Sequence, residues 1–203
     1  MFTRLIAVGL VAGLAVGCSD HGHGPHDHDH DHDHDLINRV TLFVTPVSGG
    51  AEQAFVWEDA DGPGGNAPNR IDTIRLAAGT SYNGRLEFFN TKENKDLTSA
   101  IRSERDEHQV FFTVEGNVLA VAASDIDSRN LPVGLEVLVS SVRSGSGTLK
   151  IELDHFDNTS DKNGTTRSDE TDVAVTWPVL AVGIAPVGHV GHVRRGRHSL
   201  VSC

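Results

Sequence analysis

The stretch INRVTLFVT (residues 37–45) decides the fold class, because polar and apolar residues alternate along it. A period of two is typical of a β-strand that buries one face and exposes the other. The run ends at Pro46 and the turn sequence SGG (residues 48–50), and a second run of the same type, EQAFVWE (residues 52–58), follows at once. Two such runs separated by a glycine-containing turn predict two consecutive strands.

Short runs of β-type residues recur along the chain up to residue 182. They are IDTIRL (71–76), YNGRLEFF (82–89), QVFFTV (109–114), VLAVAAS (118–124), GLEVLVSSVR (134–143), TLKIELDHF (148–156) and DVAVTWPVLAV (172–182). One segment differs: DLTSAIRSERDEH (96–108) has apolar residues at Leu97, Ala100 and Ile101 in a charged surrounding, which predicts a short helix. Strands without alternating helices predict an all-β fold, an antiparallel Ig-like β-sandwich over residues 36–182.

The composition excludes several classes of protein. The 203 residues contain 17 Lys and Arg against 28 Asp and Glu, a formal net charge of -11 at pH 7, so we expect no nucleic-acid partner. Cys18 and Cys203 are the two cysteines of the sequence, which rules out disulfide-rich and Cys-rich zinc folds. The sequence has no GxSxG, P-loop, HExxH or GxGxxG motif, and we therefore expect no enzyme.

The first seventeen residues have the organisation of an export signal. A basic residue, Arg4, precedes an apolar run at residues 5–16, which is too short for a membrane span of about twenty residues. The segment LAVGC ends in Cys18 and resembles the lipobox of bacterial lipoproteins, in which the cysteine carries the lipid. Residues 1–17 are therefore predicted to be a lipoprotein signal peptide and Cys18 the lipidation site. An ordinary secretory signal with an incidental cysteine is the alternative.

A tract rich in histidine and aspartate follows, and residues 18–35 are predicted to be disordered because nothing in the tract can pack into a core. Neutral imidazole binds zinc, copper and nickel, and carboxylates add oxygen ligands, so we predict that the tract binds zinc, or else copper or nickel. A solvated spacer, a purification tag and a pH-responsive segment are the alternatives. The candidate ligands are His21, His23, His26, His28, His30, His32, His34, Asp27, Asp29, Asp31 and Asp33.

Two histidines lie inside the predicted sandwich. His108 is placed at the start of one apolar strand and His155 at the end of another. If the two strands are antiparallel neighbours, both imidazoles reach one rim and can share a metal ion with nearby acids. Separate local hydrogen bonding of each histidine is the alternative. The candidate carboxylate ligands are Glu104, Asp106, Glu107 and Asp154.

The loop WEDADGPGGNAPNRID (residues 57–72) is a second place with oxygen ligands. It offers Asp59, Asp61, Asn66 and Asp72, although the spacing is not that of an EF-hand. Both a calcium site and a glycine-rich turn fixed by Asx hydrogen bonds are compatible with this sequence.

Several motifs together resemble a family of small exported His-rich lipoproteins of Gram-negative bacteria. Besides the lipobox and leader they are VTLFVTP (40–46), WEDADGPGG (57–65), IDTIRLAAGTSYNGRLEFFN (71–90), DEHQVFF (106–112), LDH (153–155) and ETDVAVTWPV (170–179). Members are labelled type 1 periplasmic binding fold superfamily proteins, and some occur alongside TonB-dependent outer-membrane receptors. The resemblance implies a β-rich domain, uptake of a scarce nutrient such as a metal, and an ordered site at His108 and His155. The two-lobed α/β fold in the label is not expected, because the chain has too few predicted helices.

The remaining residues, GIAPVGHVGHVRRGRHSLVSC (183–203), show no periodicity and are predicted to be a disordered tail, or an accessory metal-binding tail. The sequence as a whole favours a lipid-anchored protein of the cell envelope that captures zinc, and the resemblance implies a TonB-dependent outer-membrane receptor as a partner. A non-metal module that binds a receptor, a glycan or an envelope protein, with the leader as a spacer, is the alternative.

Overall fold

The computed structural model of the protein describes residues 36–62 and 64–183. The predicted signal peptide, Cys18, the histidine tract and the tail from residue 184 onward lie outside the described residues. No helix in the described ranges is long and apolar enough to cross a membrane.

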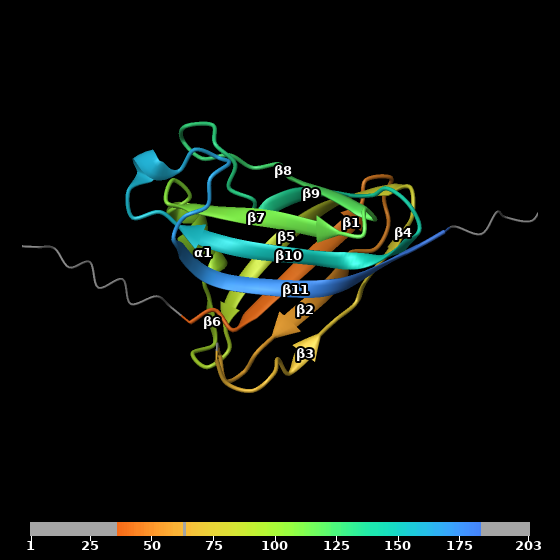
Figure 1. Ribbon diagram of the computed structural model, residues 1–203, viewed down its shortest axis with the longest axis horizontal. Coiled ribbons are helices and arrows are strands. Elements are labelled where there is room, and N and C mark those ends of the chain that lie inside the picture. The colour runs from red at the N-terminus through yellow and green to blue at the C-terminus, as the bar shows by residue number, and fades with distance from the viewer. Residues whose placement is uncertain (1–35, 63, 184–203) are drawn as a thin grey trace, which may run out of the picture. The chain divides into compact units, whose positions relative to one another are not determined.

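Two β-sheets make up the described part of the chain (Figure 1). The first has the strand order β3-β2-β1-β5-β9-β8, with β6 paired to β5, and the second has the order β4-β11-β10-β7. Neighbouring strands are antiparallel except for β4 and β11, which are parallel. The predicted all-β sandwich with one short α-helix is confirmed.

The elements have the following bounds. The first sheet contains β1 (Arg39–Pro46), β2 (Gln53–Glu58), β3 (Arg70–Ile71), β5 (Thr80–Asn90), β6 (Lys95–Asp96), β8 (Leu119–Ala123) and β9 (Glu136–Ser141). The second contains β4 (Ile74–Ala77), β7 (His108–Glu115), β10 (Gly145–His155) and β11 (Glu170–Val182), and the helices are α1 (Thr98–Ser103) and the 3-10 turn η1 (Thr159–Asp161).

Alternating residues of the long strands form one hydrophobic core between the sheets. On β10 and β11 the inward side chains are nearly inaccessible to solvent, and Trp177 is the largest of them. Burial of each such aliphatic or aromatic side chain contributes about 1.5–3 kcal/mol to folding, so this alternation is what fixes the register of the two central strands. The inward residues are Leu149, Ile151 and Leu153 from β10 and Val173, Val175, Trp177, Val179 and Ala181 from β11.

The predicted strand at residues 71–76 is in fact two strands in different sheets. Asp72 ends the first, because its carboxylate accepts hydrogen bonds from Val56 N (2.8 Å) and from the Arg70 guanidinium (2.8 and 3.0 Å). Ile71 stays 46% exposed at the edge of the first sheet, whereas Ile74 is fully buried in the second. The chain therefore crosses between the sheets within two residues.

The predicted helix at residues 96–108 is shorter than expected, covering Thr98–Ser103. Leu97 and Ile101 are buried against the core, but residues 102–107 offer no apolar side chain for a further turn of the helix. A turn closed by Glu107 N and Glu104 O (2.8 Å) follows, and β7 then begins at His108. This early end of the helix makes His108 the first residue of a strand.

Candidate metal centre

His108 and His155 lie directly opposite each other at one end of the second sheet. They are Cα partners in the antiparallel pairing of β7 and β10, where one strand begins and the other ends. The two imidazole rings are stacked, with centroids 4.7 Å apart and an angle of 17° between the planes, and both side chains are buried. The predicted meeting of the two histidines at one rim is confirmed.

Both ring nitrogens of His108 face groups other than His155. Nδ1 donates to the backbone carbonyl oxygen of Glu104 (3.2 Å), and Nε2 lies 3.5 Å from Asp172 Oδ2. Burial lowers the pKa of His108, although Glu104 O and the Asp172 carboxylate oppose this effect. His108 thus acts as the ring against which His155 packs.

His155 is the histidine that meets carboxylates. One potential ligand atom from each of His155, Asp157 and Glu170 lies within 4.8 Å of the other two. The register of β10 and β11 explains this arrangement, because His155 is paired with Glu170, the first residue of β11, and Asp157 comes just after the end of β10. Among the described residues, His155, Asp157 and Glu170 form the one group of three His, Cys, Asp or Glu side chains close enough together to hold a metal ion.

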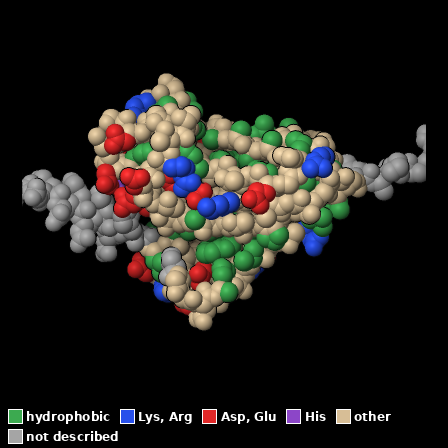
Figure 2. Space-filling view, in the orientation of Figure 1, with side chains coloured by type: hydrophobic (Ala, Val, Ile, Leu, Met, Phe, Trp, Pro, Cys, Tyr) green, Lys and Arg blue, Asp and Glu red, His purple; other side chains and the backbone are tan. Residues whose placement is uncertain are grey.

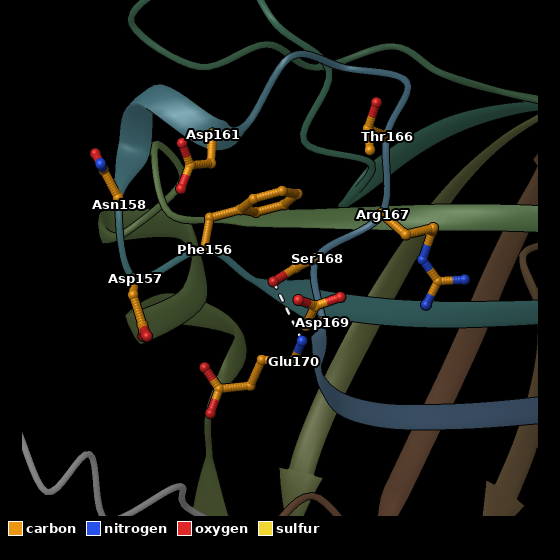
Figure 3. A pocket seen from close by; sticks show the side chains of 9 residues that line it. All are labelled: Phe156, Asp157, Asn158, Asp161, Thr166, Arg167, Ser168, Asp169 and Glu170. Carbon is orange, nitrogen blue, oxygen red and sulfur yellow. Dashed lines mark hydrogen bonds between the residues drawn. The ribbon is translucent and has the colours of Figure 1, made fainter.

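An open pocket of about 700 Å³ lies beside this cluster. Figure 3 shows the carboxylates of Asp157 and Glu170 on the same side of the pocket, below η1 and the loop that connects β10 to β11. In Figure 2 acidic side chains gather over this end of the sandwich. A cation can therefore approach the two carboxylates from solvent, whereas His155 is buried. The pocket is lined by Phe156, Asp157, Asn158, Asp161, Thr166, Arg167, Ser168, Asp169 and Glu170.

Arg167 fixes the chain just before Glu170. Its guanidinium binds both carboxylate oxygens of Asp154 (2.5 Å each) and Glu152 Oε2 (2.6 Å), and it lies over the ring of Phe111 at 4.9 Å. Hydrogen bonds with Asp154 raise the pKa of Arg167 even further above its usual range. Bidentate charge-assisted contacts of this kind hold a side chain in one orientation, which gives the pocket a rigid wall.

The four carboxylates predicted as ligands are not in the His155 cluster, and this part of the prediction is corrected. Asp154 alternates to the other face of β10, where it binds Arg167 and Thr171 Oγ1 (3.0 Å). Asp106 accepts hydrogen bonds from Ser128 N (2.9 Å) and Oγ (2.7 Å), and these bonds lower the pKa of Asp106. Glu104 and Glu107 contribute backbone carbonyls, to His108 Nδ1 and to Phe156 N (2.7 Å) respectively.

No family model matches the chain, and no curated protein matches it. One similar solved structure is that of domains 4 and 5 of the S-layer protein SbsC, at 17% sequence identity and a TM-score of 0.30, covering 70% of this chain and 76% of that one. Another is that of domains 4-9 of the surface layer protein SbsC, at 15% identity and a TM-score of 0.32, covering 74% of this chain and 23% of that one. Both TM-scores are too low to support a conclusion about this chain.

Proposed function

We propose that this protein is an exported lipoprotein of the cell envelope that captures zinc. The His/Asp leader at residues 18–35 collects the ion, and the centre of His155, Asp157 and Glu170 holds it on the folded domain. The observation that carries the proposal is the approach of these three side chains to within 4.8 Å beside an open pocket.

The chemistry of the three side chains suits zinc. Zinc in proteins takes imidazole nitrogen and carboxylate oxygen at about 2.0–2.2 Å, and sites that keep an open position use three protein ligands. Two carboxylates balance the charge of a divalent ion, and the pocket leaves the remaining coordination positions to water or to a donor from the leader. Such a centre is suited to accepting and releasing an ion.

The position of the protein in the cell is part of the same proposal. A lipid on Cys18 would hold the domain at a membrane, with the histidine tract between the anchor and the first described strand. A TonB-dependent outer-membrane receptor is the proposed recipient of the metal, on the strength of the family resemblance. Zinc captured near the membrane would then be close to the machinery that takes it up.

Calorimetric titration with zinc tests the proposal on the full chain. A variant in which the seven leader histidines are replaced by Asn is expected to lose several equivalents and to retain one. Adding Asp157→Asn to that variant should weaken the retained site by about 10-fold or more, equivalent to about 1.4 kcal/mol. Asp169→Asn is the matched control, because Asp169 lines the same pocket but is not in the cluster.

Two results would contradict the proposal. An unchanged number of zinc ions after removal of the leader histidines would show that the tract does not collect metal. Equal zinc affinity in the Asp157→Asn and Asp169→Asn variants would show that the ordered centre is not where the retained ion binds.

A further inference from the structure

Lys162 and Asp127 form a fully buried pair that joins two separate loops. Lys162 comes directly after η1 in the loop between β10 and β11, and Asp127 lies in the segment between β8 and β9. The Lys162 Nζ atom lies 3.0 Å from Asp127 Oδ2, and neither side chain has any exposed surface. An amine and a carboxyl group held this close together without solvent are the two reactants of an amide bond.

The Asp127 carboxyl group is placed as an electrophile. Its Oδ1 atom accepts hydrogen bonds from two backbone groups, Arg129 N and Leu131 N, each at 2.8 Å. The turn that presents these donors is closed by Asp127 N, which donates to Leu131 O (2.8 Å). Two backbone N–H groups on one oxygen form the arrangement of an oxyanion hole, which stabilises the negative charge that develops when a nucleophile adds to the carbon.

The Lys162 amine is placed as the nucleophile. Its Nζ atom donates to the backbone carbonyl oxygen of Arg105 (2.6 Å), which holds the amine beside Asp127. Burial lowers the pKa of Lys162 and brings its amine nearer to the uncharged form, which is the form that attacks a carbonyl carbon. The surface pair of Lys150 and Glu152 is closer, at 2.6 Å, but the Lys150 side chain is 43% exposed. Water favours the charged form of that amine, so closeness alone does not prepare a pair for reaction.

We propose that Lys162 and Asp127 join in an intramolecular isopeptide bond between Nζ and Cγ. A proton first passes from Nζ to Oδ2, which turns the ion pair into an uncharged amine and a carboxylic acid. The electron pair of the nitrogen then attacks Cγ, and the two backbone N–H groups stabilise the negative charge that develops on Oδ1. A second proton moves from the nitrogen to Oδ2, the bond between Cγ and Oδ2 breaks, and one water molecule leaves. The pair supplies both protons, so no other reactant is needed.

The charge state of Asp127 sets the rate of this reaction. Burial would raise the pKa of Asp127, but hydrogen bonds from Leu131 N and Lys162 outweigh burial and lower it. The uncharged pair is therefore a minor form, and we expect the bond to form slowly after folding. Newly folded protein contains the ion pair, and aged protein contains the bond.

The bond would tie the wall of the pocket to a distant part of the domain. It joins the loop after η1, which borders the pocket in Figure 3, to the connection between β8 and β9. The cross-link closes a loop of about 35 residues, and such a link stabilises a protein by restricting its unfolded chain. For this loop length the unfolding midpoint should rise by about 8–15 °C, in addition to the contribution of the ion pair. The bond does not depend on the proposed zinc function.

Peptide mapping of the full chain tests the proposal. Trypsin cleaves after Lys and Arg, so unlinked protein gives a peptide of residues 106–129, which contains Asp127, and is cut after Lys162. Linked protein is expected to give residues 106–129 joined to residues 151–167, because an amide on Nζ prevents cleavage after Lys162. The mass of the joined species is lower than that of its two peptides by one water molecule. Its amount should increase with time in folded protein, and none should form in urea.

Lys162→Arg is the matched variant, because a guanidinium keeps the charge but does not attack a carboxyl group. It should give no joined peptide, and circular dichroism checks that it folds. Lys150 is a control within the same digest, since trypsin should cut after it completely. Folded, unaltered protein without the joined peptide after prolonged incubation would mean that the pair is only ionic. Equal amounts of joined peptide in buffer and in urea would mean that the fold does not drive the reaction. Either result overturns the proposal.

Discussion

Lys162→Met tests the buried ion pair that anchors the loop beside the pocket. The Lys162 side chain is fully buried directly after η1, and its Nζ donates to Arg105 O (2.6 Å) and lies 3.0 Å from Asp127 Oδ2. Burial lowers the pKa of Lys162, whereas the hydrogen bond with the Asp127 carboxylate opposes this effect and favours the charged pair. Met keeps most of the side-chain volume and removes the charge.

The expected loss of stability follows from what remains around Asp127. Breaking a buried ion pair costs about 3–5 kcal/mol, because one charge stays buried without its partner. Asp127 keeps two backbone donors, Arg129 N and Leu131 N, each at 2.8 Å, and the Arg129 guanidinium lies 3.6 Å from Asp127 Oδ2, so we expect a value near the lower end, about 3 kcal/mol. For a domain of this size that corresponds to a fall of about 6–12 °C in the unfolding midpoint.

Urea unfolding, followed by tryptophan fluorescence, measures this loss. Lys150→Met is the matched control, because the Lys150 side chain is 43% exposed and forms a surface pair with Glu152 at 2.6 Å. Surface pairs of this kind contribute about 0–1 kcal/mol. A Lys162→Met variant that loses no more stability than Lys150→Met would refute the reasoning that the buried pair holds the loop.

Three further predictions concern the anchor, the acid stability and the core. Cys18→Ser should move the protein from the membrane to the soluble fraction almost completely, because stable anchoring needs more than one acyl chain; an unchanged distribution would rule out lipidation at this residue. Acid should destabilise the domain, because Asp127 and Glu152 have lowered pKa values in the folded state. Burial alone would raise both pKa values. Hydrogen bonds outweigh burial: Leu131 N and Lys162 donate to Asp127, and Arg167 donates to Glu152. Carboxylates with a lowered pKa in the folded state stabilise it fully above their unfolded pKa of about 4, and this effect is lost as the pH falls through the folded pKa. Urea midpoints should therefore drop as the pH falls below about 4, and a flat profile would contradict the assignment. Leu153→Ala, at a fully buried position of β10, should cost about 2–5 kcal/mol with an unchanged dependence on urea, and a smaller loss would mean that the core collapses around the gap.

The sequence predicts most of this fold because alternation reports burial residue by residue. In β1, β10 and β11 the inward positions that form the hydrophobic core are apolar, and the observed strands agree with the predicted ones to within a few residues. The prediction of one strand at 71–76 was wrong, because a single alternating pattern does not reveal that one strand ends before Asp72 and another begins at Ile74 in the opposite sheet. Side-chain hydrogen bonds to a distant strand carry no signal in local periodicity.

Of the three members of the candidate site, His155 was predicted from the sequence. Strand ends indicated that His108 and His155 would meet, and they do. Glu170 and Asp157 were missed, because the connection between β10 and β11 is too long for a hairpin rule to give the register that sets Glu170 opposite His155. Asp154 was wrongly included, because being next to His155 in a strand places a side chain on the opposite face.

The place of β11 in its sheet governs the order in which the domain can assemble. Within the described residues β4 is hydrogen-bonded to β11 and to no other strand, yet the two are separated by most of the domain in sequence. A chain that emerges from its N-terminus, from a ribosome or through a translocation channel, can pair β1 with β2 and β5 early, but it must wait for β11 before β4 is covered. Until then the backbone of β4 lacks its hydrogen-bonding partner strand. Folding is therefore completed only when nearly the whole domain has been delivered, so the domain closes late in its synthesis.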